Sequence, residues 1–153
     1  MKEVPMGLLD WLQNWLRGGS AAGLSEQERR FQGLDIPEVL EAHRAWRRRL
    51  EEAVERCQIE ELDLSVIVRD DQCRLGQWIY LEAARTTLAL HPEFARLREA
   101  HRRFHLAAAR VVQALRLQGQ AAALALLAGE FDQCSKEIVQ SLAELVQKEQ
   151  SLG

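Results

Sequence analysis

The chain has 153 residues with a net charge of -3, and 47% of the residues are hydrophobic. This length suits one domain with its own core, and this hydrophobic content excludes a disordered chain. The abundant residues are good helix formers (Leu, Ala, Glu, Arg, Gln), which predicts an all-α fold. Acidic and basic residues are interleaved, as where Glu51 and Glu52 follow Arg47 and Arg48, so a basic surface for nucleic acid is not expected.

The cysteines argue for a reducing compartment. Cys57, Cys73 and Cys134 are odd in number and far apart, which does not suit a disulfide framework. The chain has no apolar run of about 20 residues that would span a bilayer. Its N-terminus also lacks the uninterrupted apolar stretch of a signal peptide. We therefore expect a cytoplasmic protein.

The first segment in chain order is a short amphipathic arm, residues 1–17, which contains Trp11 and Trp15. A Gly/Ser/Ala-rich stretch follows it, so we predict a flexible linker at 18–34 and the main domain at 35–150. The arm either folds back on the main domain or docks on a partner. Its polar face has only one basic residue, which makes a membrane surface the weaker candidate for that partner.

The main domain is expected to begin with a long helix capped by Asp35, with Pro37 in its first turn. Apolar positions on one face of this helix recur at steps of three and four residues up to Cys57. A less regular segment spans 58–71. Cys73 then opens a shorter helix that runs towards Leu90, and Pro92 ends it.

Two further helices follow. One begins after Pro92 and ends at Gly119, and the other covers the apolar positions from Leu124 to Leu145. Four amphipathic helices with short connections predict an antiparallel four-helix bundle, with the N-terminal arm as an extra short helix.

Three of the four histidines fall on the apolar faces of these helices. His101 and His105 are four residues apart, so both project from one face of the third helix. His43 lies on the face of the first helix, and Cys73 opens the second. Three imidazoles and one thiolate suit a tetrahedral Zn²⁺. The spacing alone leaves open a polar core without metal, whereas a di-iron bundle is disfavoured because no Glu lies three residues before these histidines.

Three sequence blocks carry a resemblance to a known family. They are His43-Arg-Ala-Trp46, Cys73-Arg-Leu-Gly76-Gln-Trp78 and His101-Arg-Arg-Phe104-His105. In this order they resemble the signature of the chemoreceptor zinc-binding (CZB) domain, and the resemblance extends over roughly residues 36–148. It implies that His43, Cys73, His101 and His105 are the zinc ligands.

The resemblance also implies a function. Domains of this family are appended to bacterial chemoreceptors and to diguanylate cyclases, where they respond to zinc or to oxidants. No such signalling domain is recognisable in this sequence, so we expect a freestanding member that signals through a partner protein. The resemblance further suggests a homodimer.

Residues near the predicted site have several possible roles. Asp70 and Asp71 either accept a proton from a ligand imidazole or belong to a solvated loop or helix cap. Cys57 and Cys134 are expected to be small buried hydrophobic residues, and His91 a loop residue.

A site with four protein ligands leaves no open position for water, so we expect binding or sensing and no enzymatic activity. The signal is either zinc itself or oxidation of the zinc-bound Cys73. The alternative function is an interaction scaffold in which zinc is a permanent structural staple.

Overall fold

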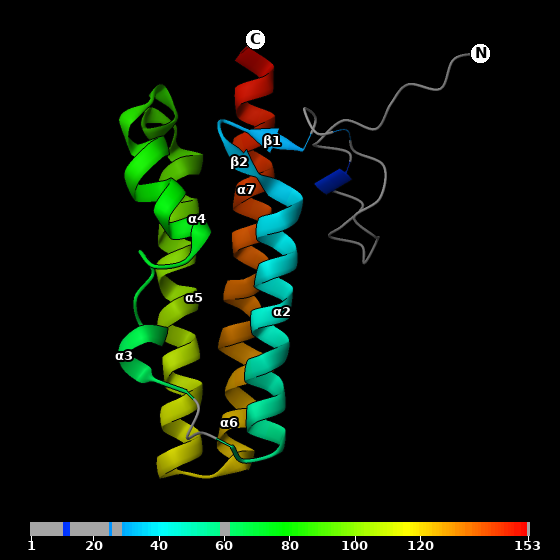
Figure 1. The fold of residues 1–153 in the computed structure, drawn as a ribbon, viewed down its shortest axis with the longest axis vertical. Helices are drawn as coiled ribbons and strands as arrows, with labels where there is room; N and C mark the ends of the chain where they lie inside the picture. The colour runs from blue at the N-terminus through cyan, green and yellow to red at the C-terminus, as the bar shows by residue number, and fades with distance from the viewer. Residues whose placement is uncertain (1–10, 13–24, 26–28, 59–61, 153) are drawn as a thin grey trace, which may run out of the picture.

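The computed structural model describes residues 11–12, 25, 29–58 and 62–152. Its framework is three long helices, α2 (Ile36–Glu55), α5 (Pro92–Leu117) and α7 (Asp132–Leu152). In Figure 1, α2 and α5 run downwards and α7 runs upwards between the same two ends of the molecule. The prediction of a mainly α-helical chain is confirmed.

Helix α2 begins as the sequence predicts. The side chain of Asp35 accepts a hydrogen bond from the backbone N–H of Glu38 at 3.1 Å, and Pro37 occupies the first turn. Six residues of the helix are buried, and they give it the apolar face expected from the spacing: Ile36, Pro37, Val39, Leu40, Leu50 and Val54. His43 and Trp46 lie on the middle turns of the same helix.

The segment between α2 and α5 differs from the prediction. In place of one helix from Cys73 to Leu90, the structure has α4 (Arg74–Gln77), the π-helical η1 (Trp78–Glu82) and the 3₁₀ turns η2 (Ala83–Arg85) and η3 (Thr87–Leu90). A further short helix, α3 (Leu64–Ile67), precedes them. The break has a local cause at Thr86, whose backbone is extended and whose hydroxyl accepts a hydrogen bond from the N–H of Leu88. The prediction of a single second helix is therefore wrong.

The last helical stretch begins just after Gly119, which has a φ of +101° and links α5 to α6 (Gln120–Leu126). One π-helical turn, η4 (Leu127–Phe131), joins α6 to α7. The fourth helix is thus longer than the span from Leu124 to Leu145 predicted from its apolar positions. Large side chains of α5, η4 and α7 are buried in the core, including Phe94, Leu97, Phe131 and Leu142.

A small hairpin precedes α2 and was not predicted. Strands β1 (Arg30–Phe31) and β2 (Leu34–Asp35) pair antiparallel, with Phe31 opposite Leu34. The turn residues Gln32 and Gly33 both have positive φ, as a two-residue hairpin turn of this hand requires. Phe31 and Leu34 are buried, so the end of the segment expected to be a linker packs against the helices.

The N-terminal arm is described only at Trp11 and Leu12, both of which are fully buried. The remainder of the arm and most of the predicted linker lie outside the described residues, and the division into arm, linker and main domain stays a prediction. No helix in the described part of the chain is both long and apolar enough to cross a membrane.

Candidate metal centre

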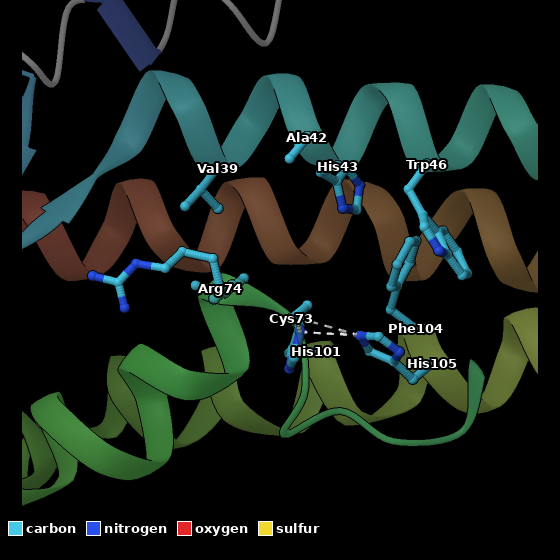
Figure 2. Close-up of a pocket in the computed structure, with 10 residues that line it drawn as sticks. Val39, Ala42, His43, Trp46, Cys73, Arg74, His101, Phe104 and His105 are labelled. Carbon is cyan, nitrogen blue, oxygen red and sulfur yellow. Dashed lines mark hydrogen bonds between the residues drawn. The ribbon is translucent and has the colours of Figure 1, made fainter. Parts of the chain in front are cut away.

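Cys73, His101 and His105 converge on one point between α4 and α5. The Sγ atom of Cys73 lies 3.1 Å from Nε2 of His101 and 3.7 Å from Nε2 of His105, and the two Nε2 atoms are 3.2 Å apart. Figure 2 shows the two imidazoles on adjacent turns of α5, with Cys73 beside them. All three donor atoms lie within 4.8 Å of one another. The predicted pairing of the i, i+4 histidines with the thiol is therefore present.

These distances fit a shared metal ion. A tetrahedral zinc ion with ordinary bond lengths separates two nitrogen ligands by about 3.3 Å and a sulfur from a nitrogen by about 3.6 Å. The observed distance between the two nitrogens is 3.2 Å, and the two distances from sulfur to nitrogen are 3.1 and 3.7 Å. All three are within about 0.5 Å of the values for a shared zinc ion. One thiolate and two imidazoles are also the donor types that zinc selects. The three residues form a group able to hold a metal.

The hydrogen bond made by Nδ1 of His105 supports the assignment of a metal site. This nitrogen lies 2.9 Å from the backbone carbonyl oxygen of Ile67, an arrangement in which Nδ1–H donates and the lone pair of Nε2 faces Cys73. Metal-bound histidines are commonly oriented by such a bond. The corresponding Nδ1 of His101 is buried and has no hydrogen-bond partner among the described residues.

Burial sets the protonation states at the centre. Desolvation, with a smaller contribution from the neighbouring histidines, lowers the pKa of His101 to about 3. Desolvation also lowers the pKa of His105. Both rings are therefore neutral near pH 7, the form that binds a metal. Burial raises the pKa of the Cys73 thiol, so metal binding there must release its proton.

Cys73 is held in place by the start of α4. It is the N-cap residue of this helix, and its Sγ accepts a hydrogen bond from the N–H of Gly76 at 3.4 Å. A Cβ atom at position 76 would lie 1.7 Å from the backbone carbonyl oxygen of Asp70, so the chain can pass there only with glycine. The loop before Cys73 therefore folds back tightly on the first turn of α4.

His43 faces the same cavity from α2 but is engaged elsewhere. Its Nε2 lies 2.8 Å from Oγ of Ser135 on α7, and its ring packs on Phe104 with the centroids 4.5 Å apart. Desolvation, followed by repulsion from Arg47, lowers the pKa of His43 to about 4, so this ring too is neutral. The compact group of three donors does not include His43. Its role as the fourth ligand stays a prediction.

The cavity in front of the three donors has a volume of about 170 Å³. Figure 2 shows that α2 provides one wall and that α4 and α5 provide the opposite one. The lining is mostly apolar and consists of Val39, Ala42, His43, Trp46, Cys73, Arg74, Leu75, His101, Phe104 and His105. The centre thus lies beside a mostly apolar cavity that His43 also lines from α2.

The remaining candidate residues have other contacts. Asp70 accepts a hydrogen bond from the hydroxyl of Tyr80, and Asp71 pairs with Arg69 at 3.4 Å. The acceptor for a ligand imidazole is instead a backbone carbonyl.

Of the other two cysteines, Cys134 is buried as expected, whereas Cys57 is exposed and has a φ of +54°, so the expectation of a buried Cys57 is wrong. Cys57 follows the end of α2 at Glu55, in the turn that closes the helix. His91, expected in a loop, immediately precedes α5, and its Nε2 lies 3.1 Å from Glu149.

Two partners of the histidines were not found in the sequence. The carbonyl of Ile67 left no signal, because every residue has one. Ser135 did leave a signal in the sequence. It lies four residues after Phe131 and seven before Leu142, a position on the inner face of α7 where an apolar residue is expected.

Comparison with protein families gives one match. Residues 43–112 match the model of the chemoreceptor zinc-binding domain. The matched segment contains His43, Cys73, His101 and His105. Comparison with curated proteins and with solved structures found no significant match. Over residues 43–112, the chain is similar to the chemoreceptor zinc-binding domain family.

Proposed function

We propose that this protein is a zinc-binding regulatory module that reports zinc availability or oxidation to a partner protein. The observation that carries the proposal is the convergence of Cys73 Sγ with the Nε2 atoms of His101 and His105 within 4.8 Å. The match to a regulatory zinc-binding family points the same way. In this proposal His43 completes the site as the fourth ligand, since it lines the same cavity.

A four-ligand site suits sensing better than catalysis. Catalytic zinc sites keep a position open for water or substrate, whereas a centre with four protein ligands is closed. The described residues that line the cavity are largely apolar, and none of them is a carboxylate that would act as a general base at the metal. Bound zinc would supply a crosslink between helices, and its loss would free them.

Cys73 is the residue through which oxidation would act. It is half-buried, lines the cavity and is the one sulfur in the group of three donors. Oxidation of the sulfur to sulfenic acid weakens its bond to a metal. Since Cys73 also caps α4, its release would loosen the start of that helix.

The experiment that tests this function follows zinc release from the loaded full-length protein with a chromophoric indicator. Addition of stoichiometric hypochlorous acid is expected to release zinc. A Cys57→Ala, Cys134→Ala double variant, which retains Cys73, is expected to release it to the same extent. Release only to a competing chelator would indicate a zinc sensor. Zinc that resists both treatments would indicate the alternative function, a scaffold stapled permanently by zinc.

The partner is proposed from the family. Chemoreceptor zinc-binding domains belong to bacterial signalling proteins, so a component of chemotaxis or cyclic-di-GMP signalling in the cytoplasm is the partner we propose, with the protein acting as a homodimer. The N-terminal arm is the segment proposed to reach that partner. A variant lacking residues 1–17 is expected to retain zinc and to lose capture of the partner.

A further inference from the structure

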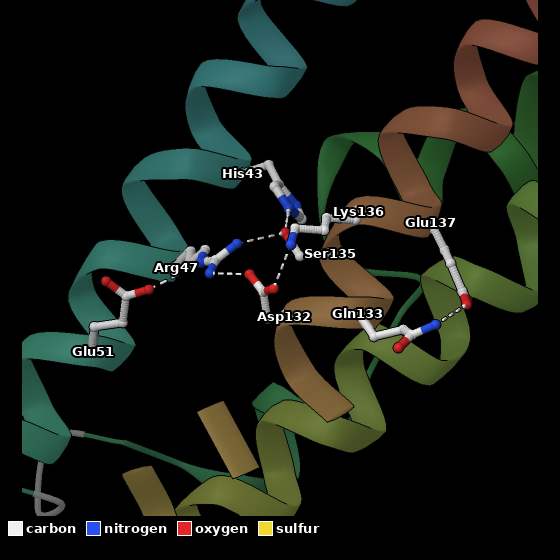
Figure 3. A network of polar contacts seen from close by, with 8 residues as sticks. All are labelled: His43, Arg47, Glu51, Asp132, Gln133, Ser135, Lys136 and Glu137. Carbon is white, nitrogen blue, oxygen red and sulfur yellow. Dashed lines mark hydrogen bonds and ion pairs between the residues drawn. The ribbon is translucent and has the colours of Figure 1, made fainter. Parts of the chain in front are cut away.

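A polar network links α2 to α7. Ser135 is a buried polar residue on α7, 5% exposed, and its hydroxyl contacts two side chains of α2. One is Nε2 of His43 at 2.8 Å, and the other is Nη1 of Arg47 at 3.3 Å. Arg47 in turn pairs with Asp132, one turn before Ser135. Figure 3 shows this network bridging the two helices.

The direction of each hydrogen bond follows from the chemistry of the partners. A guanidinium can only donate, so Ser135 Oγ accepts from Arg47. The hydroxyl hydrogen then needs an acceptor, and Nε2 of the neutral His43 is the acceptor in contact with it. The hydroxyl therefore donates to Nε2. That bond occupies the nitrogen lone pair that a metal ion would need.

The surroundings hold Ser135 in this role. Asp132 binds Arg47 and also Lys136, at 2.9 Å, while Arg47 binds Glu51 at 2.9 Å. The guanidinium is thus fixed from both helices and cannot swing away from Ser135 without breaking two ion pairs. On the other side, Phe104 packs against the His43 ring. Neither ring nitrogen of His43 joins the compact group formed by Cys73, His101 and His105.

We propose that Ser135 is a positioning residue that competes with the metal for His43 and so sets how tightly zinc is held. This inference rests on the proposed zinc-binding function. When His43 is bonded to Ser135, α2 is tied to α7. When His43 turns to the cavity, α2 is tied to α4 and α5, which carry the other three ligands. The exchange gives the metal centre a direct connection to α7, a helix that carries none of the predicted ligands.

The test measures the zinc dissociation constant of the full-length protein by competition with a chromophoric chelator. Ser135→Ala removes the competing hydroxyl while keeping the helix, and it is expected to bind zinc roughly 2- to 10-fold more tightly, the factor for one net hydrogen bond. Ser141→Ala is the matched control, because Ser141 is a second buried serine on α7 that lies farther along the helix. It is expected to bind like the wild type.

His43→Ala shows whether the effect passes through His43. The substitution should weaken zinc binding, and adding Ser135→Ala to it should change nothing further. Weaker or unchanged binding by Ser135→Ala would overturn the inference, as would a gain that persists without His43. Wild-type protein that binds no zinc would instead overturn the proposed function.

A second measurement needs no variant. Long-range ¹H–¹⁵N spectra of the chelator-treated wild type should show His43 with a protonated Nδ1 and a hydrogen-bonded, unprotonated Nε2. A protonated Nε2 would contradict the assigned direction of the bond from Ser135.

Discussion

At the scale of single residues, the geometry of the site depends on Gly76. A Cβ atom at this position would lie 1.7 Å from the backbone oxygen of Asp70 and 2.8 Å from its carbonyl carbon. Glycine has only a hydrogen atom there. Backbone atoms cannot rotate away as a side chain can. We therefore expect Gly76→Ala to displace the loop before Cys73 and to destabilise the fold by about 3 kcal/mol, as overpacking does. Zinc affinity should fall as well, because Cys73 moves with the loop.

Urea denaturation checks this prediction, with Gly129→Ala as the control. Gly129 lies in the helical turn η4, and nothing lies within 4 Å of a Cβ atom there. Alanine at this position should leave the free energy of unfolding unchanged or raise it by about 0.5–1 kcal/mol. Equal effects of the two substitutions would show that the contact with Asp70 does not matter.

Residue-scale electrostatics predict a loss of stability in acid. Burial lowers the pKa of His101 to about 3 and that of His43 to about 4, whereas both have an ordinary value of 6.5 in an unfolded chain. Between those values the unfolded state binds more protons than the folded state. The free energy of unfolding should therefore be highest above pH 6.5 and fall as the pH drops towards 4, by about 1.4 kcal/mol for each histidine and each pH unit.

Denaturation of the chelator-treated protein at a series of pH values measures this slope. His43→Gln should show a shallower dependence, because one of the buried histidines is gone. A wild-type free energy of unfolding that stays flat from pH 6.5 to pH 4 would contradict the burial of neutral histidines.

The candidate ligands could be predicted from sequence to different degrees. His101 and His105 are fixed relative to each other by helical spacing, and Cys73 by the motif that opens α4, so all three appear together as expected. The orientation of the His43 ring could not be predicted. It depends on Ser135, 92 residues away in the chain, and no local pattern relates the two.

At the scale of elements, the hairpin β1–β2 packs against α4 and η1, which directly follow Cys73. Phe31 packs on Trp78 with ring centroids 6.1 Å apart, and the indole N–H of Trp78 donates to the carbonyl of Gln32 at 2.8 Å. Arg74 donates to the carbonyl of Gly33 at 3.2 Å. Three contacts thus join three hairpin residues to α4 and η1.

We expect Phe31→Ala to destabilise the protein by about 3–5 kcal/mol through the cavity it leaves. It should also weaken zinc binding, because Trp78, which directly follows the helix capped by Cys73, loses its packing contact with Phe31. The measurement is urea denaturation together with chelator competition. Leu117→Ala is the control, since Leu117 is 81% exposed and its loss should cost little. Unchanged zinc affinity in Phe31→Ala would show that the hairpin does not support the site.

The long helices were predictable and the short ones were not. Helices α2, α5 and α7 have sustained apolar spacing over many turns, with Asp35 and Pro92 marking two of their starts. The segment 74–90 has helical composition, but its turns are set by tertiary contacts such as the bond from Trp78 to Gln32 and by the local cap at Thr86. The hairpin was hidden because its strands are only two residues long and follow a Gly/Ser-rich stretch.

At the scale of the whole molecule, the metal centre lies where three separate parts of the chain meet. Cys73 comes from the broken segment, the histidine pair comes from α5, and His43 faces them from α2 (Figures 1 and 2). A metal bound by all four would hold α2 and the broken segment against α5. Such a crosslink is a means by which the state of one thiol can alter the packing of several helices.

The most direct test of this account is the zinc content of the purified full-length protein, measured by elemental analysis. We predict one zinc ion per chain in the wild type and in Cys134→Ala, whose thiol is not part of the group of three donors. We predict strong loss of zinc in Cys73→Ala and in His101→Ala. Wild-type protein that contains no zinc after purification without chelator, or Cys73→Ala that retains a full complement, would contradict the assignment of the metal centre.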